Sequence, residues 1–274
     1  MAAVSSVDNV EKYYDSDPQL EWDRLAVYPT EFHVTLRVLR DSLPPAPARI
    51  ADIGGGPGRY SLELTRRGYD VTLLDLSSAN LKLAKEKAAE LKVELKEVIH
   101  GNALDLPFAD SSFDAVLLLG PLYHFHSREQ RVKCLRETLR VVKPGGLIVA
   151  AWINRFSVFR DFAKRDPESL LQNPSFLDVA SSHGKYDPAM LGDFFCDAYF
   201  AHPDEIVPEC DEAGLEVVER VGVEGVVSRN DEKVNQLKGE SWEKWVDINY
   251  RLGREPSMLG ASDHIVAVCR KKPE

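Results

Sequence analysis

A glycine-rich turn near the start of the chain constrains its fold more than any other feature. A short β-rich run over residues 49–53 leads directly into the turn from Gly54 to Gly58, and a helical pattern follows. Beside the carboxyl end of a parallel strand a ligand can approach the backbone, and glycines permit both the turn and the close contact. The turn therefore predicts a parallel α/β sheet with a ligand at the end of its first strand.

Short β-rich runs alternate with helical patterns along most of the chain. We expect strands at residues 49–53, 71–75, 93–99, 113–118, 146–152, 215–223 and 264–269. Alternation of this kind gives right-handed crossovers and a mostly parallel sheet. Between the strands, Ser77 or Ser78 is expected to cap one helix, and helices are expected near residues 203–213 and 233–252. The pattern predicts a doubly wound α/β fold.

No Gly/Ser-rich or Pro-rich linker divides the 274 residues, so we expect one domain with insertions. Residues 8–42 have a helical pattern that ends at Pro44 and Pro45. Residues 154–202 break the alternation of strands and helices with several prolines and an aromatic cluster that includes Phe194. We interpret this stretch as an inserted cap.

Charge and cysteine content narrow the class of protein. The formal net charge of −10 repels phosphate backbones and anionic membranes, so neither nucleic acid nor membrane is an expected partner. The cysteines have no metal-ligand spacing, and we expect buried, reduced thiols and no metal; they are Cys134, Cys196, Cys210 and Cys269. The first 25 residues are acidic and lack the apolar stretch of a secretory signal. By elimination we expect a cytoplasmic protein.

Two aspartates near the glycine turn indicate the ligand. Asp75 ends the predicted second strand, where a carboxylate can accept both hydroxyls of a ribose and would repel a 2′-phosphate. Taken alone, Asp75 could equally cap a helix. Asp52 either braces the loop or contacts a ligand ammonium through water.

The glycine turn does not complete the G-x-G-x-x-G pattern of dinucleotide-binding proteins, because Arg59 stands where the pattern has its last glycine. This mismatch disfavours a dinucleotide as the ligand and a nicotinamide-dependent oxidoreductase as the function.

Four stretches together resemble the class I S-adenosylmethionine-dependent methyltransferases, particularly the small-molecule branch with the ubiquinone and menaquinone methyltransferases. They are residues 52–58, 73–75, 101–108 and 139–146, in the order and spacing of that family. The resemblance implies a Rossmann-like, seven-stranded, mostly parallel sheet with helices on both faces, and S-adenosylmethionine as cofactor. In similar enzymes the N-terminal segment folds over the cofactor, so residues 1–45 are expected to form a helical lid and residues 46–153 the cofactor-binding core. From the pattern of the residues themselves, we expect residues 154–202 to form a substrate cap and residues 203–274 the last part of the sheet.

The same resemblance assigns roles to individual residues. Gly54 and Gly56 would line the methionine part of the cofactor, Asp75 would hold the ribose, and Asn102 with Ala103 would meet the adenine. Asn102 departs from the family, which often has an acid there; its carbonyl can still accept from the adenine amino group. The complete set of expected cofactor residues is Tyr14, Asp52, Gly54, Gly56, Asp75, Leu76, Asn102, Ala103, Leu119 and Gly120.

Candidate residues for the chemistry follow the predicted fourth strand and lie in the cap. His124 is either a brace for its loop or a general base, and His202 is a second candidate base. Tyr123, Phe195 and Tyr199 could line an acceptor pocket or simply pack in the core. His126 is expected at the surface, where the next helix begins.

The expected function is methyl transfer to O, N or S of a small metabolite by a monomer or homodimer. The alternatives are a methyltransferase that acts on a protein or RNA, and a non-catalytic nucleoside-binding regulator. An N-P-P-Y-type loop after the fourth strand would indicate methylation of a flipped base. Residues 120–123 are Gly-Pro-Leu-Tyr instead, which argues against that substrate.

Overall fold

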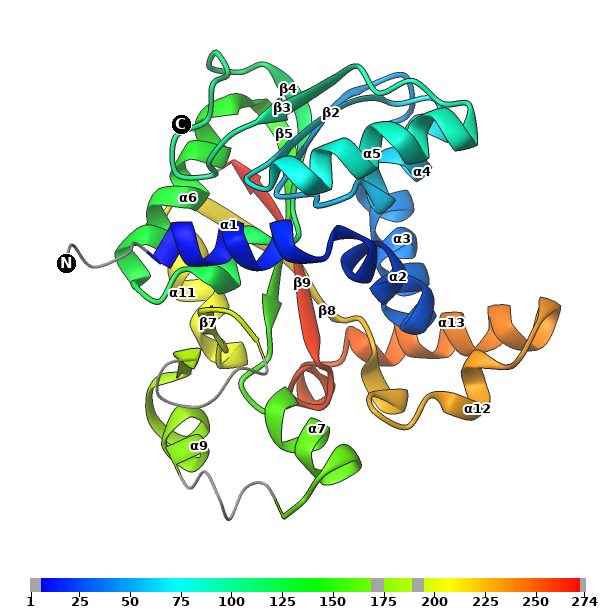
Figure 1. Cartoon of the computed structure of the whole chain (residues 1–274), viewed down its shortest axis with the longest axis vertical. Coiled ribbons are helices and arrows are strands. Elements are labelled where there is room, and N and C mark those ends of the chain that lie inside the picture. Colours follow the sequence, from blue (N-terminus) through cyan, green and yellow to red (C-terminus); the bar gives the residue numbers. More distant parts are fainter. Residues whose placement is uncertain (1–5, 169–174, 189–194, 272–274) are drawn as a thin grey trace.

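The computed structural model describes residues 6–168, 175–188 and 195–271, and its largest sheet has seven strands (Figure 1). These strands are β1 (Arg49–Ile53), β2 (Asp70–Asp75), β3 (Glu97–His100), β4 (Phe113–Leu118), β5 (Val142–Ile153), β8 (Leu215–Gly222) and β9 (His264–Lys271). They are ordered β3-β2-β1-β4-β5-β9-β8, and β9 pairs antiparallel with both of its neighbours while the remaining pairs are parallel. The predicted seven-stranded, mostly parallel sheet is confirmed.

Helices cover both faces of the sheet and bury its apolar side chains (Figure 1). They are α3 (Pro29–Ser42), α4 (Arg59–Arg66), α5 (Ser78–Leu91), α6 (Arg128–Val141), α11 (Ile206–Glu212) and α13 (Gly239–Gly253). One core cluster joins α3, α4 and α13 to the sheet, and the other joins α6 and α11 to the opposite face. The strand order reverses between β1 and β4, which opens a crevice at their carboxyl ends.

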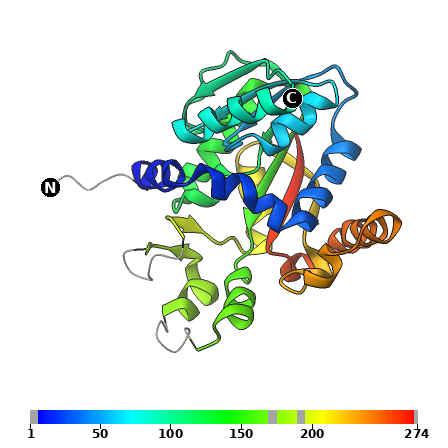
Figure 2. The same ribbon diagram turned by 45° about the vertical axis from the view of Figure 1, so that its right-hand side comes forward.

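The N-terminal segment forms three helices where the sequence predicted one helical stretch. α1 (Ser6–Ser16) and α2 (Pro18–Val27) precede α3, and a proline opens both α2 and α3. Proline fits the first turn of a helix but cannot continue a preceding one, so each proline redirects the chain. The Asp17 side chain accepts from Leu20 N and caps α2. In both views α1 lies between the α/β body and the cap (Figure 1, Figure 2).

The described parts of the insertion after β5 lie below the sheet in Figure 1. Its elements are α7 (Ser157–Arg165), α9 (Ser175–Asp178), the π-helical turn η2 (Val179–His183), β6 (Lys185–Tyr186) and β7 (Ala198–Tyr199). β6 and β7 pair antiparallel, and a small apolar core that includes Tyr186 and Phe200 holds them against Ile153. Phe194, part of the aromatic cluster in the sequence, lies outside the described residues.

Several predicted boundaries were wrong. β3 begins at Glu97 rather than residue 93, and β5 begins at Val142, ahead of Gly145 and Gly146, because Val142 already pairs with Phe113 before the register shifts. The helix expected over residues 233–252 is two helices, α12 (Glu232–Asn235) and α13, and Gly239 at their junction has a φ of 56°.

Short 3-10 turns connect the remaining elements. They are η1 (Pro121–His124), η3 (Pro203–Glu205), η4 (Gly225–Val227) and η5 (Pro256–Ala261). Ser77 caps α5 as expected, since its side chain accepts from Asn80 N. All four cysteines are buried, also as expected. Among the described residues, no helix combines the length and the apolar character needed to cross a bilayer.

Candidate cofactor and acceptor site

The glycine turn connects β1 to α4 with backbone angles that favour glycine. Gly54, Gly56 and Gly58 have φ angles of 66°, 57° and 84°. Gly54 N donates to Leu74 O at 2.7 Å, which ties the turn to β2. A Cβ atom on Gly54 would lie 2.5 Å from the Pro121 side chain, so the turn also requires the missing side chain for its contact with η1.

Asp75 ends β2 directly beside this turn. Its Oδ2 accepts from Gly56 N at 2.7 Å, and its Oδ1 accepts from Ser77 N at 2.8 Å. Each carboxylate oxygen can accept a further hydrogen bond, so two hydroxyls of a ribose can still be held. Burial raises the pKa of Asp75 to about 6, against the hydrogen bonds from Ser77 and Gly56, which lower it.

Two buried oxygens around the same turn have no hydrogen-bond partner within the described part of the chain. They are Asp52 Oδ1 and Asn80 Oδ1, and both residues line the cavity described below. The other oxygen of Asp52 accepts from Ser61 Oγ at 2.7 Å. Burial raises the pKa of Asp52 to about 6. Unpaired buried acceptors are costly, so these atoms fit a ligand that brings donors such as an ammonium and hydroxyls.

A cavity extends from the glycine turn to the loop after β4. Every residue of the predicted cofactor set lines it: Tyr14, Asp52, Gly54, Gly56, Asp75, Leu76, Asn102, Ala103, Leu119 and Gly120. The Asn102 side-chain oxygen accepts from Leu104 N at 2.9 Å, which fixes the amide at the edge of the cavity. The sequence therefore identified one continuous wall, whereas the contact that each residue makes with a cofactor stays a prediction.

The predicted lid covers this cavity through contacts from α1. Tyr14 OH lies 3.0 Å from His124 Nε2, and Asp15 Oδ1 accepts from Ser77 Oγ at 2.6 Å and from Ala79 N at 3.1 Å. Ser77 follows Asp75 by two residues, so α1 is anchored beside the expected ribose position and also to His124 of η1. Val7 and Val10 of α1 complete an apolar cover.

His124 is buried at the end of η1, and its hydrogen bonds define its protonation. Nδ1 lies 3.0 Å from the carbonyl oxygen of Asp197, which can only accept, so Nδ1 carries the proton. Nε2 then accepts from the Tyr14 hydroxyl. Burial lowers the pKa of His124 to about 4, so the ring is neutral and a weak base. This geometry supports the bracing role, and any catalytic role stays a prediction.

The other candidates for acceptor chemistry separate into two groups. Tyr123 lines the cavity. Phe195 does not line it, although its ring contacts those of Tyr13 and His124. Tyr199 is packed against the Arg131 guanidinium and donates to Glu205, away from the cavity. His202 also lies outside the lining, where its Nδ1 accepts from Asp204 N and caps η3.

One prediction outside the expected cofactor and acceptor residues was wrong. His126 does not lie free at the surface at the start of a helix, because α6 begins at Arg128 and His126 Nε2 lies 2.8 Å from Tyr186 O of the cap. The cavity is also lined by Asn80, Glu21 and Tyr60, to which no role was assigned from the sequence. Asn80 had a signal, since it lies in the first turn of the helix that follows Asp75.

Known proteins resemble this chain over part of its sequence and over most of its fold. Residues 51–150 match the family model described as "Methyltransferase domain". A demethylmenaquinone methyltransferase from Renibacterium salmoninarum is 37% identical over 116 residues, which are 42% of this chain and 46% of that protein. The chain thus spans about half the length of the curated relatives that it matches.

Solved structures share the fold over most of the chain. An S-adenosylmethionine-dependent methyltransferase from Methanosarcina mazei has a TM-score of 0.59 at 23% identity and covers 86% of this chain and 98% of its own. The 1,6-didemethyltoxoflavin-N1-methyltransferase of Burkholderia thailandensis, with S-adenosylhomocysteine bound, has a TM-score of 0.57 at 16% identity and covers 98% and 87%. Residues 51–150 thus match a methyltransferase domain, and the chain as a whole shares the fold of S-adenosylmethionine-dependent methyltransferases.

Proposed function

We propose that the protein transfers the methyl group of S-adenosylmethionine to O, N or S of a small organic metabolite. The observation that carries the proposal is the cavity whose lining combines the nucleoside-binding signature, the glycine turn with Asp75, with the side chains of Tyr14, Tyr123 and His124. The name of the demethylmenaquinone methyltransferase relatives also supports a small acceptor.

The bound cofactor would supply an activated methyl group on its sulfonium, and the protein has to hold and orient the two reactants. Asp75 and Asn80 would accept from the ribose, Asp52 would face the ammonium, and Asn102 would meet the adenine. The lid helices α1 and α2 would exclude water. Tyr14 is oriented by neutral His124, so its oxygen can accept a hydrogen bond from the acceptor and align its nucleophile.

The test has two parts, because cofactor binding and methyl transfer can fail separately. Calorimetric titration should show binding of S-adenosylmethionine and none of NAD. Purified protein should then form S-adenosylhomocysteine with at least one member of a metabolite panel that begins with demethylmenaquinone. Tight binding of NAD alone would refute the cofactor, and cofactor binding without turnover on any member would refute the acceptor class. Methyl transfer to an RNA or a peptide would show that the acceptor is a polymer and not a small metabolite.

The cytoplasmic location and the monomeric or homodimeric state stay predictions from the sequence. The net charge of −10 supports the expectation that nucleic acid is not the acceptor. Mass photometry of the purified chain would establish the oligomeric state directly.

A further inference from the structure

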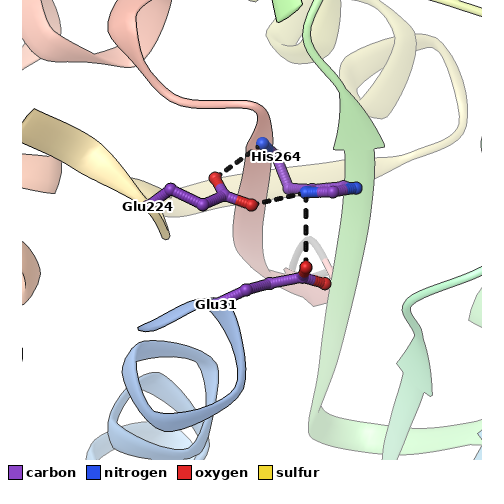
Figure 3. A group of neighbouring side chains, drawn as sticks. All are labelled: Glu31, Glu224 and His264. Carbon is purple, nitrogen blue, oxygen red and sulfur yellow. Dashed lines mark hydrogen bonds and ion pairs between the residues drawn. The ribbon is translucent and has the colours of Figure 1, made fainter. Parts of the chain in front are cut away.

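Four side chains of alternating charge connect the cavity wall to the start of β9, and Figure 3 shows three of them. Arg24 of α2 lines the cavity, and its two terminal nitrogens donate to Glu31 of α3 at 2.8 and 2.9 Å. His264 Nδ1 lies 3.8 Å from Glu31 Oε2 and 2.5 Å from Glu224 Oε1. We call Arg24, Glu31, His264 and Glu224 the charge chain.

The two carboxylates that face Nδ1 favour a positive charge on His264. Burial by itself would lower the pKa of His264, but Glu31 and Glu224 outweigh that effect and raise it to about 9. Arg24 opposes the rise only in part. With His264 protonated, two cations alternate with two anions and the formal charges cancel, which is the condition under which buried ions are tolerated.

Within the described part of the chain, the other charged groups near the charge chain are paired elsewhere, although Arg229 also lowers the pKa of Glu31. The neighbouring Asp263 pairs with Arg160 and Arg229, so those two cations are already engaged. Tyr60 of α4 lies close enough to be influenced by Glu31 and Glu224, and its own pKa is raised, so it stays neutral. Ile153, the partner of His264 on β5, is apolar.

Glu31, Glu224 and His264 have the composition of a metal site, and their nearest ligand atoms lie within 4.8 Å of one another. Their hydrogen bonds argue against that use. Both oxygens of Glu31 are engaged by Arg24, and Glu224 Oε2 accepts from Ser262 Oγ, Asp263 N and His264 N. A divalent cation would have to displace the His264 proton and lie beside the Arg24 guanidinium, so a proton fills the position between the carboxylates.

We propose that His264 is a positioning residue that holds Arg24, and with it the lid helix α2, in the wall of the cavity. The proposal rests on the proposed function, because the lid is expected to cover the bound cofactor. Without charge on His264, the Glu31 and Glu224 carboxylates repel each other, and Glu31 can no longer present both oxygens to Arg24 in the same position. Arg24 keeps 31% of its side-chain surface exposed, so it can move when Glu31 does.

The experiment measures the affinity for S-adenosylhomocysteine by calorimetry from pH 7 to pH 10, which needs no acceptor. In the wild type we expect the dissociation constant to rise about tenfold more over this range than in His264→Lys, which keeps the positive charge. His264→Gln should bind weakly at every pH. Glu224→Gln removes one carboxylate from His264, so its loss of affinity should begin about one pH unit lower than in the wild type.

Glu240→Gln is the matched control, since Glu240 is 83% exposed and pairs only with Lys244 of its own helix among the described residues. It should reproduce the wild-type profile. The amino group of the ligand titrates identically in all variants, so only differences between variants count. Circular dichroism at pH 7 establishes that each variant is folded.

Identical pH profiles for wild type, His264→Lys and Glu224→Gln would overturn the proposal. So would a thermal stabilisation by Zn²⁺ that the wild type shows and His264→Gln lacks, because a metal would then occupy the position of the proton. These results differ from a failure of the proposed function, in which S-adenosylhomocysteine binds with the expected profile but no acceptor is methylated.

Discussion

The two sides of the cavity are built from very different kinds of interaction. The floor, within residues 51–150, consists of two consecutive strand ends and the turns that follow them, so Asp52, Gly54 and Asp75 lie within 24 positions of one another in the sequence. The cover and the far wall join α1 and α2 to segments more than one hundred residues away, through Tyr14 with His124 and through Arg24 with the charge chain. Local geometry fixes the floor, and long-range packing fixes the cover.

The largest effect is expected where the floor touches the loop after β4. Gly54→Ala would place a Cβ atom 2.5 Å from Pro121 on a backbone with a φ of 66°. Relief of this clash requires the turn to move, and we expect cofactor affinity to fall by a factor of about 100 or more, roughly 3 kcal/mol.

Gly145→Ala provides the matched control for Gly54→Ala. Its φ is 75°, but nothing lies within 4 Å of the added Cβ. It should lose about 1 kcal/mol of stability and no cofactor affinity, as measured by thermal melts and calorimetry. Equal effects of the two substitutions on affinity would show that the floor tolerates movement.

The ribose contact comes next in size. Asp75→Ala removes the acceptor that holds the turn at Gly56 and the expected hydroxyls, and it should lower cofactor affinity by about 1–3 kcal/mol. Asp70→Ala, at the exposed start of the same strand, should leave affinity unchanged. Calorimetry on the folded variants measures both, and an unchanged affinity in Asp75→Ala would remove this residue from the ribose.

Two carboxyl groups of the floor should determine how cofactor affinity changes below pH 7. Asp52 and Asp75 have pKa values of about 6 in the ligand-free protein, and a ligand that donates hydrogen bonds favours their ionised forms. At pH 5 each carboxyl group must therefore release a proton when the cofactor binds. Cofactor affinity should fall by about tenfold per carboxyl group between pH 7 and pH 5. In Asp52→Asn the fall in cofactor affinity should be shallower. A pH profile as steep as that of the wild type would show that the Asp52 carboxylate does not contribute to cofactor binding.

The same raised pKa values determine how stability without ligand depends on pH. Because the folded pKa of each group lies above its unfolded value of 3.8, folding favours the protonated forms. Their contribution is fully present below pH 3.8 and is lost as the pH rises through 6. Denaturant titration at several pH values measures how the free energy of unfolding changes with pH. The expected sign of this change is opposite to that produced by a carboxylate in an ion pair.

A smaller effect is expected for the cover. Tyr14→Phe keeps the ring but removes the hydroxyl that donates to His124, and we expect cofactor affinity to fall about fivefold, close to 1 kcal/mol. Tyr13→Phe is the control, because Tyr13 is 39% exposed and does not line the cavity. A loss of cofactor affinity as large as that of Asp75→Ala would mean that the cover contributes as much to cofactor binding as the floor does.

The smallest effect is expected in the cap. His202 caps η3 outside the cavity, so His202→Ala should cost about 0.5–1 kcal/mol of stability and change turnover less than twofold. A tenfold loss of turnover with unchanged stability would restore His202 as a candidate base. Thermal melts and initial rates on the first accepted substrate distinguish these outcomes.

The sequence by itself determined the floor of the site and the sheet that carries it. Its signals are local, because a strand that ends in glycines and a second strand that ends in Asp75 must lie side by side in any right-handed parallel pairing. Element ends were less well determined, as at Val142, since the beginning of β5 depends on its pairing with Phe113 and not on its own composition.

Only the tertiary structure decided which distant side chains complete the site. Tyr199 and His202 had suitable chemistry and suitable order in the sequence, yet packing turned them toward Glu205 and η3. Conversely, nothing in the sequence marked Glu224 and His264 as neighbours of Arg24 and Glu31. Contacts of this kind depend on how three separate segments fold onto one sheet, and the energy that fixes them arises only once burial has removed water from their charges.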